Sequence, residues 1–251
     1  MFTSNPFADL TVFLPPLVMQ VYIVLMIFAV AIGTLFDMLH KSSAKFFALQ
    51  RKKSQAAATR RLSGAETASI AIRTIAKEVA TSGEFCNPKR RISHLLMFYG
   101  FLLHFITTIV MVFGYPTQAT PAPGVLPVLW NIGALMILIG GYWFFFFLRV
   151  NVAYEGHSPF SLMRADLFIV TLLGSVTLAC IWEIVQIAGN LTTTKIAFGL
   201  YIFFTTLLFV SVAWSKLAHM FYKPVMAFQR RVEEANGSST LPTPAARNEG
   251  R

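Results

Sequence analysis

Long runs of apolar residues alternate with short polar segments along the chain, and this alternation predicts its secondary structure. Five windows reach or approach the roughly 20 apolar residues that a membrane-spanning helix needs. They lie at about residues 14–36, 95–114, 125–148, 166–187 and 196–215. The pattern predicts an all-α integral membrane protein built as a bundle of five transmembrane helices.

The segments outside these windows predict the remaining organisation. In "ETASIAIRTIAKEVA", residues 66–80, apolar residues recur at helical spacing, which predicts an amphipathic helix on the membrane surface or under a soluble partner. From about residue 234 the sequence has no apolar period and is typical of a disordered tail. The predicted parts are residues 1–36 (outer segment and first span), 37–93 (basic loop with the amphipathic helix), 94–218 (four-helix core) and 219–251 (tail).

The lysines and arginines are distributed so unevenly that they predict the orientation of the bundle. Positively charged residues are retained on the cytoplasmic side of a membrane protein. With five spans, 20 of the 21 lysines and arginines fall on one side and only Lys195 falls on the other. We therefore expect the N-terminus outside, the C-terminus and the long helical loop in the cytoplasm, and a multi-pass location in the bacterial inner membrane.

Composition and charge narrow the possible functions. The chain is 55% apolar and has 24 phenylalanines, which is typical of a lipid-embedded protein. Its formal net charge of +10 is explained by the topology signal and by attraction to an anionic inner leaflet, and does not indicate nucleic-acid binding. The two cysteines, Cys86 and Cys180, form no CxxC motif, so the chain lacks the usual spacing for an iron–sulfur or zinc site.

Histidines in the spans are the first candidates for functional residues, because placing an ionisable side chain inside a membrane costs free energy. His94 opens the second predicted span and His219 closes the fifth, so both lie at similar depth near the inner face. Two imidazoles reaching across a bundle from different helices can hold a haem iron from both sides. The alternative is that each is an interfacial side chain among lipid headgroups.

A third histidine, His104, lies ten residues after His94 on the same predicted helix. Ten residues rise about 15 Å and turn the side chain about 80° away, so one haem cannot use both. His104 therefore needs a partner or a role of its own.

Two stretches carry a resemblance to a known family: "SHLLMFYGFLLHFITT" at residues 93–108 and "WSKLAHMFYKPV" at residues 214–225. Over about residues 75–232 the chain resembles the membrane subunit of respiratory nitrate reductase. It resembles more closely the membrane domain of the quinone-interacting membrane-bound oxidoreductase. That complex and the related membrane anchors partner with adenylylsulfate reductase in sulfur metabolism.

The resemblance implies a set of haem ligands. In the nitrate reductase type, two histidines ten residues apart on the second span and two eighteen apart on the fifth bind two stacked b haems. Carried over, His94 pairs with His219 as the metal ligands of a haem b on the cytoplasmic side. The fourth ligand would stand at position 201, where this chain has Tyr201. His104 then has no histidine partner, and one haem is favoured over two.

Without an iron, His104 is interpreted as a contact for a quinone substrate. A quinone site needs a hydrogen-bond donor and a proton-accepting group beside a flat apolar pocket. Polar and aromatic residues of the outer half of the spans could supply these groups: Tyr201, Trp130, Asn131, Trp182, Glu183 and Gln186. Glu183 is the candidate for relaying protons, although it could instead lie merely near the outer headgroups.

The leading hypothesis is therefore a membrane b-type cytochrome subunit that passes electrons between a cytoplasmic redox partner and the quinone pool. By resemblance, the partner is adenylylsulfate reductase or its iron–sulfur and flavin modules, and the chain is an oxidoreductase subunit that acts only within a complex. A heterodisulfide-reductase-like or nitrate-reductase-like module is the alternative partner. A haem-free membrane anchor or small transporter is the alternative function.

Overall fold

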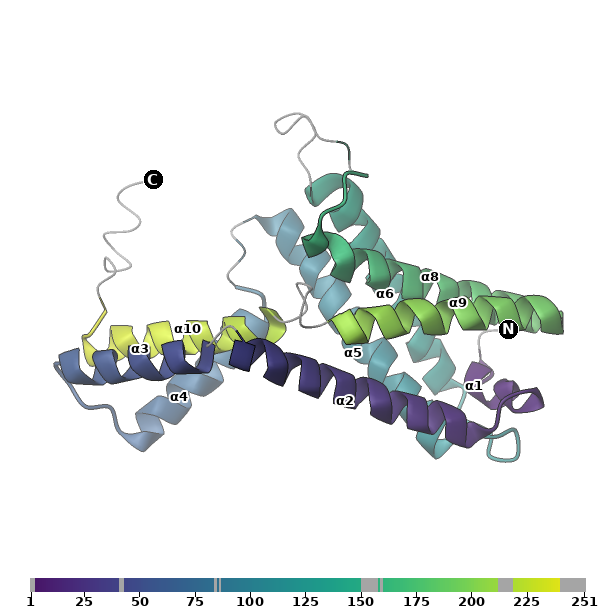
Figure 1. The fold of residues 1–251 in the computed structure, drawn as a ribbon, viewed down its shortest axis with the longest axis horizontal. Helices are drawn as coiled ribbons and strands as arrows, with labels where there is room; N and C mark the ends of the chain where they lie inside the picture. Colours follow the sequence, from purple (N-terminus) through teal and green to yellow (C-terminus); the bar gives the residue numbers. More distant parts are fainter. Residues whose placement is uncertain are drawn as a thin grey trace. The chain divides into compact units, whose positions relative to one another are not determined.

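The structure is a computed structural model that describes residues 3–40, 43–83, 85, 87–149, 158, 160–211 and 219–239. These residues form helices and connecting turns without any β-strand (Figure 1). Five helices of the described residues are long and apolar enough to cross a membrane, which confirms the predicted all-α class and the five long apolar helices. They are α2 (Pro16–His40), α5 (Pro88–Gly114), α6 with the π-helical turn η3 (Val125–Leu148), α8 (Leu167–Ile187) and α9 (Leu191–Val210).

The chain divides into two compact units. The first comprises residues 1–36 and 85–218, and therefore contains most of α2 and the other four long helices. The second comprises residues 37–84 and 219–251. Its helices are α3 (Ser43–Ala57), α4 (Gly64–Thr74), the π-helical turn η2 (Ile75–Ala80) and α10 (His219–Asn236).

In the second unit, polar side chains join α3 to α10. Gln50 donates to Glu233 over 3.1 Å, and Asn236 donates to Ser54 over 3.1 Å. A capping box starts α4, because Ser63 accepts from the backbone of Glu66 while Glu66 accepts from the backbone of Ser63. The tail predicted to be disordered after about residue 234 falls mostly outside the described residues, and α10 itself continues to Asn236.

Helix caps set boundaries that the apolar windows do not show. The side chain of Asn87 accepts from the backbone N–H groups of Lys89 and Arg90, and Pro88 occupies the first helical position. Helix α5 therefore begins seven residues before the predicted window at 95, and His94 lies well inside the helix. Asn190 caps α9 in the same way, so that helix also begins earlier than predicted.

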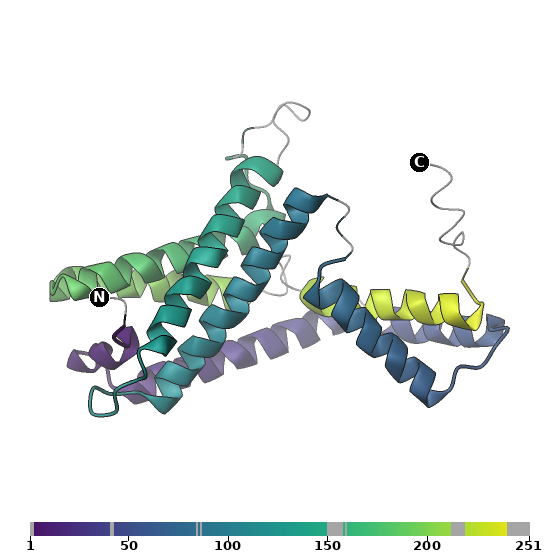
Figure 2. The same ribbon diagram turned by 180° about the vertical axis from the view of Figure 1, so that it is seen from behind.

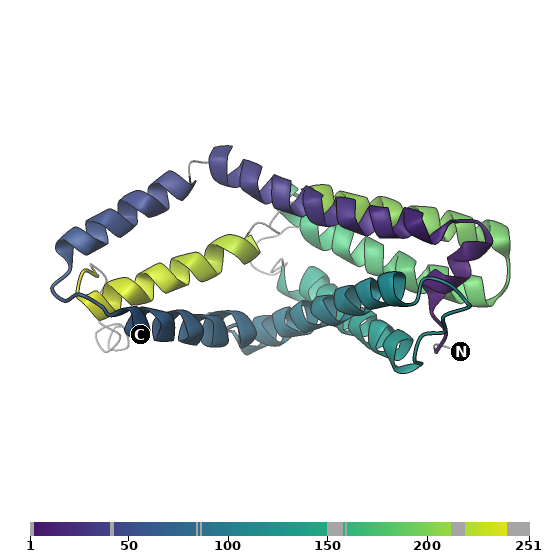
Figure 3. The same cartoon turned by 90° about the horizontal axis from the view of Figure 1, so that it is seen from below.

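Helices α5 and α6 pack with their backbones almost in contact (Figures 2 and 3). A Cβ atom added to Gly133 would lie 2.7 Å from the backbone nitrogen of His104, and one added to Gly100 would lie 2.8 Å from the carbonyl oxygen of Gly133. Gly140 faces the backbone oxygen of Ser93 at 2.8 Å in the same manner. Small residues thus let the two helices approach closely, as is common within membranes.

A short N-terminal helix, α1 (Pro6–Asp9), covers one end of the first unit. Asn5 donates to the backbone oxygen of Tyr115 over 2.8 Å, just beyond the end of α5. The ring of Phe7 packs against those of Trp130 and Trp182, with centroids 5.9 and 5.3 Å away. We call the region around Asn5, Phe7 and Tyr115 the α1 end of the first unit.

A buried ion pair ties the end of η3 to the start of α8. Arg149 and Asp166 lie 2.5 Å apart, and their side chains are only 6% and 4% exposed. The guanidinium of Arg149 also lies 4.8 Å from the centroid of the Phe145 ring. A buried pair of this kind depends on both partners, because either charge alone would be poorly solvated there.

Candidate functional site

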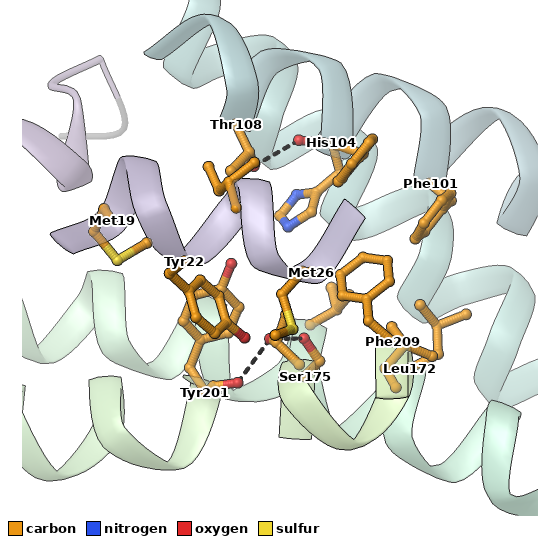
Figure 4. Close-up of a pocket in the computed structure, with 15 residues that line it drawn as sticks. Met19, Tyr22, Met26, Phe101, His104, Thr108, Leu172, Ser175, Tyr201 and Phe209 are labelled. Atoms are coloured by element: carbon orange, nitrogen blue, oxygen red, sulfur yellow. Dashed lines mark hydrogen bonds between the residues drawn. The ribbon is translucent and has the colours of Figure 1, made fainter. Parts of the chain in front are cut away.

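A cavity lies between α2, α5, α8 and α9 in the first unit (Figure 4). Its empty volume is about 590 Å³, including the part that opens to the surroundings. Most of its lining is apolar. The polar lining residues are Tyr22, His104, Thr108, Ser175, Tyr201 and Thr205.

His104 is oriented in this cavity by a backbone group of the neighbouring helix. Its Nδ1 lies 3.1 Å from the carbonyl oxygen of Trp130, and the side chain is 8% exposed. Because a carbonyl oxygen only accepts, Nδ1 carries the hydrogen and donates it. In the neutral imidazole, Nε2 then keeps its lone pair, and the ring points into the cavity (Figure 4). A lone pair presented in this way can bind a metal or accept a hydrogen bond.

Trp130 supports His104 from behind. Its ring stacks on the imidazole with centroids 4.5 Å apart and 27° between the planes. Its Nε1 donates to the hydroxyl of Thr108 over 2.8 Å, and that hydroxyl donates to the carbonyl oxygen of His104 over 2.8 Å. Trp130 is fully buried and is not among the residues that line the cavity, although the sequence interpretation placed it at a quinone.

Tyr201 reaches the same cavity from α9, so the structure brings together two residues that the sequence singled out. The ring of Tyr201 lies parallel to that of Trp182, with centroids 5.7 Å apart. On the other side Tyr22 of α2 shares a hydrogen bond with Thr206 over 3.0 Å, which joins α2 to α9. Two phenol rings and one imidazole therefore surround a mostly apolar space.

A pair of hydroxyl groups forms another polar part of the lining. Ser175 and Thr205 share a hydrogen bond of 2.7 Å, and Thr205 donates to the carbonyl oxygen of Tyr201 over 2.7 Å. These hydroxyls and that of Thr108 were not predicted from the sequence. One signal could have found two of them, because Thr108 follows His104, and Thr205 follows Tyr201, by one helical turn on the same face.

Glu183 and Gln186 do not line this cavity. They lie at the α1 end of the first unit, where Gln186 donates to the backbone oxygen of Pro6 over 3.0 Å. Glu183 is 2% exposed and accepts from Asn131 over 3.0 Å. The structure thus separates the predicted outer cluster into a cavity-lining group and a second buried polar group.

The structure describes the side chain of only one of the two predicted haem ligands. The ring of His94 has two aromatic neighbours, with centroids 5.0 Å from that of Phe85 and 6.4 Å from that of Phe98. His219 is the first residue of α10, but its side chain and residues 212–218 lie outside the described part of the chain. The His94–His219 pair therefore stays a prediction. In the described residues no cluster of three or more potential metal ligands occurs, whereas axial ligation of a haem needs only two.

Comparison of the chain with known protein families, with curated proteins and with solved structures gives no match. The case for a function therefore depends on the residues themselves.

Proposed function

We propose that this chain is the membrane-spanning subunit of a quinone-linked redox complex, and that it carries electrons between a soluble partner and the quinone pool. The main support is the placement of His104. A buried imidazole with Nδ1 held by the Trp130 carbonyl presents its other nitrogen to a cavity inside a bundle of apolar helices. An imidazole fixed by a second hydrogen bond is the usual arrangement for a histidine that binds a metal or moves a proton.

In this proposal the cavity binds the quinone ring. Its apolar walls hold a flat, lipid-soluble ring, while the Nε2 lone pair of His104 accepts a hydrogen bond from a quinol hydroxyl or takes its proton. Tyr201 and Tyr22 supply hydroxyl groups on the side of the cavity formed by α9 and α2. Trp130 and Thr108 do not touch the ligand and act by fixing the orientation of His104.

His94 and His219 would hold a b-type haem as its two axial ligands. The surroundings of His94 fit such a group, because the rings of Phe85 and Phe98 give it a flat, apolar setting. When bound, the haem would supply reversible one-electron transfer, while the chain provides the ligands and a low-dielectric wall. One haem is proposed, since Tyr201 stands at the position of the fourth histidine.

The lysines and arginines support an orientation with the second unit in the cytoplasm. A soluble iron–sulfur or flavin oxidoreductase, such as adenylylsulfate reductase, would dock on this basic side. The chain would then be a multi-pass protein of the bacterial inner membrane, with the α1 end of the first unit facing outward.

The test is a reduced-minus-oxidised absorption spectrum of the full chain, produced with ample haem and purified in a folded state. A b-type α band is expected. Replacement of His94 or His219 by alanine should abolish the band, whereas His104→Ala should keep it and weaken quinone binding. His40→Ala serves as the matched control and should change neither. If well-folded protein lacks the band, the haem is refuted and a haem-free anchor is the better account.

A further inference from the structure

Glu183 is a carboxyl group buried within a membrane-spanning helix. It is 2% exposed, and its Oε1 accepts a hydrogen from Asn131 over 3.0 Å. Asn131 also donates to the carbonyl oxygen of Pro127 over 3.1 Å, so both hydrogens of its amide are used. The other carboxyl oxygen of Glu183, Oε2, is buried without a hydrogen-bond partner.

No described lysine or arginine forms an ion pair with Glu183. Among the described residues, the titratable groups near Glu183 include Cys180, one turn earlier on α8, and Asp9 on α1, whose carboxyl accepts from Gln186 over 3.4 Å. The facing part of α6 contributes only the neutral amide of Asn131. A carboxylate with one oxygen unsatisfied in such surroundings is strongly unfavourable, whereas a neutral acid with its hydrogen on Oε2 is not.

Polar groups continue from Glu183 to the surface at the α1 end. Gln186, one turn later on α8, donates to Pro6 over 3.0 Å and to Asp9 over 3.4 Å. Asp9 in turn accepts from the exposed Gln118 over 2.9 Å. The Oε1 atom of Gln186 is buried without a partner and can accept from a water molecule. Hydrogen bonds therefore connect Gln186, one turn after Glu183, through Asp9 to the exposed Gln118.

Glu183 also has a neighbour on the side of the cavity. The adjacent residue, Trp182, is fully buried and stacks on Tyr201, which lines the cavity. The Nε1 of Trp182 is a further buried donor without a partner. Glu183 thus follows a residue that stacks on the cavity lining and lies one turn before Gln186, which contacts α1, although Glu183 itself does not line the cavity.

We propose that Glu183 is a proton-holding site that exchanges its proton with water at the α1 end of the first unit. In the exchange the O–H bond at Oε2 breaks and the proton moves to water beside Gln186 and Asp9. The carboxylate that remains keeps the hydrogen bond from Asn131 and is reprotonated by the reverse step. Coupling of this exchange to quinone chemistry in the cavity rests on the proposed function, whereas holding and exchanging the proton do not.

The first test is the infrared spectrum of the full chain in lipid nanodiscs at neutral pH, without added quinone. A carbonyl band of a protonated carboxylic acid is expected, and Glu183→Gln should remove it. Glu183→Asp should keep a shifted band, and Glu66→Gln, which changes an exposed carboxyl outside the spans, should leave it as it was. A spectrum in which Glu183→Gln retains the full band would overturn the proposal.

The second test follows exchange of the same band after transfer to D₂O. Gln186→Leu removes the polar group between Glu183 and Asp9, so the deuterium shift of the band should slow by at least about tenfold. The control is Gln118→Leu, which changes an exposed residue beyond Asp9 and should slow the shift less. An unchanged rate in Gln186→Leu would refute the exchange path.

The third test concerns coupling. If the chain shows its haem band, proton release on quinol oxidation should slow by at least about tenfold in Glu183→Gln, while the haem spectrum stays unchanged. Unaltered release would overturn the coupling. The infrared tests need neither haem nor quinone, so a Glu183 band in a chain without a haem band would refute the proposed function and support the proton site.

Discussion

The close approach of α5 and α6 predicts that Gly133→Ala destabilises the protein. A Cβ atom at this position would lie 2.7 Å from the backbone nitrogen of His104 and 2.9 Å from the carbonyl oxygen of Gly100, whereas ordinary contact begins at 3.4 Å. Backbone atoms cannot rotate aside as a flexible side chain can. The helices must therefore separate by several tenths of an ångström.

The size of the effect follows from three contributions. Overpacking of a tight contact costs about 1–3 kcal/mol. Separation also stretches the 3.1 Å contact between His104 and the Trp130 carbonyl, and loss of a hydrogen bond costs about 0.5–1.5 kcal/mol. Alanine regains about 1 kcal/mol through its higher helix propensity. The net loss of unfolding free energy is expected to be roughly 0.5–3.5 kcal/mol.

The assay is unfolding of the purified protein by SDS titration in mixed micelles, followed by circular dichroism. Gly199→Ala is the matched control, because a Cβ atom on this residue of α9 meets nothing within 4 Å. The control should be neutral or more stable by about 0.4–1 kcal/mol. If Gly133→Ala proves as stable as Gly199→Ala, the backbone contact between α5 and α6 does not exist as described.

Three further substitutions test other contacts. Asp166→Ala removes the buried partner of Arg149 and should lower the unfolding free energy by about 3–5 kcal/mol in the same titration, and a wild-type transition would contradict the ion pair. Tyr22→Phe removes the hydroxyl that contacts Thr206 and the Ile202 carbonyl oxygen of α9, and should lower the unfolding free energy by about 0.5–1.5 kcal/mol. No loss would mean that these contacts do not hold α2. The hydrogen bond from the backbone N–H of Ser63 holds the pKa of Glu66 below its usual range. The stabilisation of α4 by ionised Glu66 is therefore fully present above the usual pKa of a glutamate, and it is lost as the pH falls through the lowered pKa. The protection of α4 amides from hydrogen exchange, expressed relative to the intrinsic exchange rate at each pH, should therefore fall in acid in the wild type, and Glu66→Gln should remove this change with pH.

The apolar windows predicted the five long helices because burial in lipid demands a nearly continuous run of apolar residues. They did not predict where α5 begins, since the helix continues through the charged residues 89–91 under the control of the Asn87 cap. Hydropathy indicates which residues lie in lipid, whereas a capping residue determines where a helix begins or ends.

The candidate site was predicted only in part. The apolar windows placed His104 and Tyr201 in the spans, but they cannot show which helix faces meet, so Tyr22 and Ser175 were missed. The acceptor for His104 is a backbone carbonyl, and no pattern of side chains in the sequence indicates such a partner. The packing of Phe7 against Trp130 and Trp182 was equally hidden, because α1 is too short to have a periodic signal.

Helix α2 is the least buried of the five long helices. Only 11% of its most apolar window is buried, against 50% for α8, although Met19, Tyr22 and Met26 of α2 form one wall of the cavity. An element with few buried contacts is expected to separate from its neighbours at the lowest cost in free energy. In a bilayer, a lipid-soluble molecule would then reach the cavity from among the acyl chains, past α2, without passing through water.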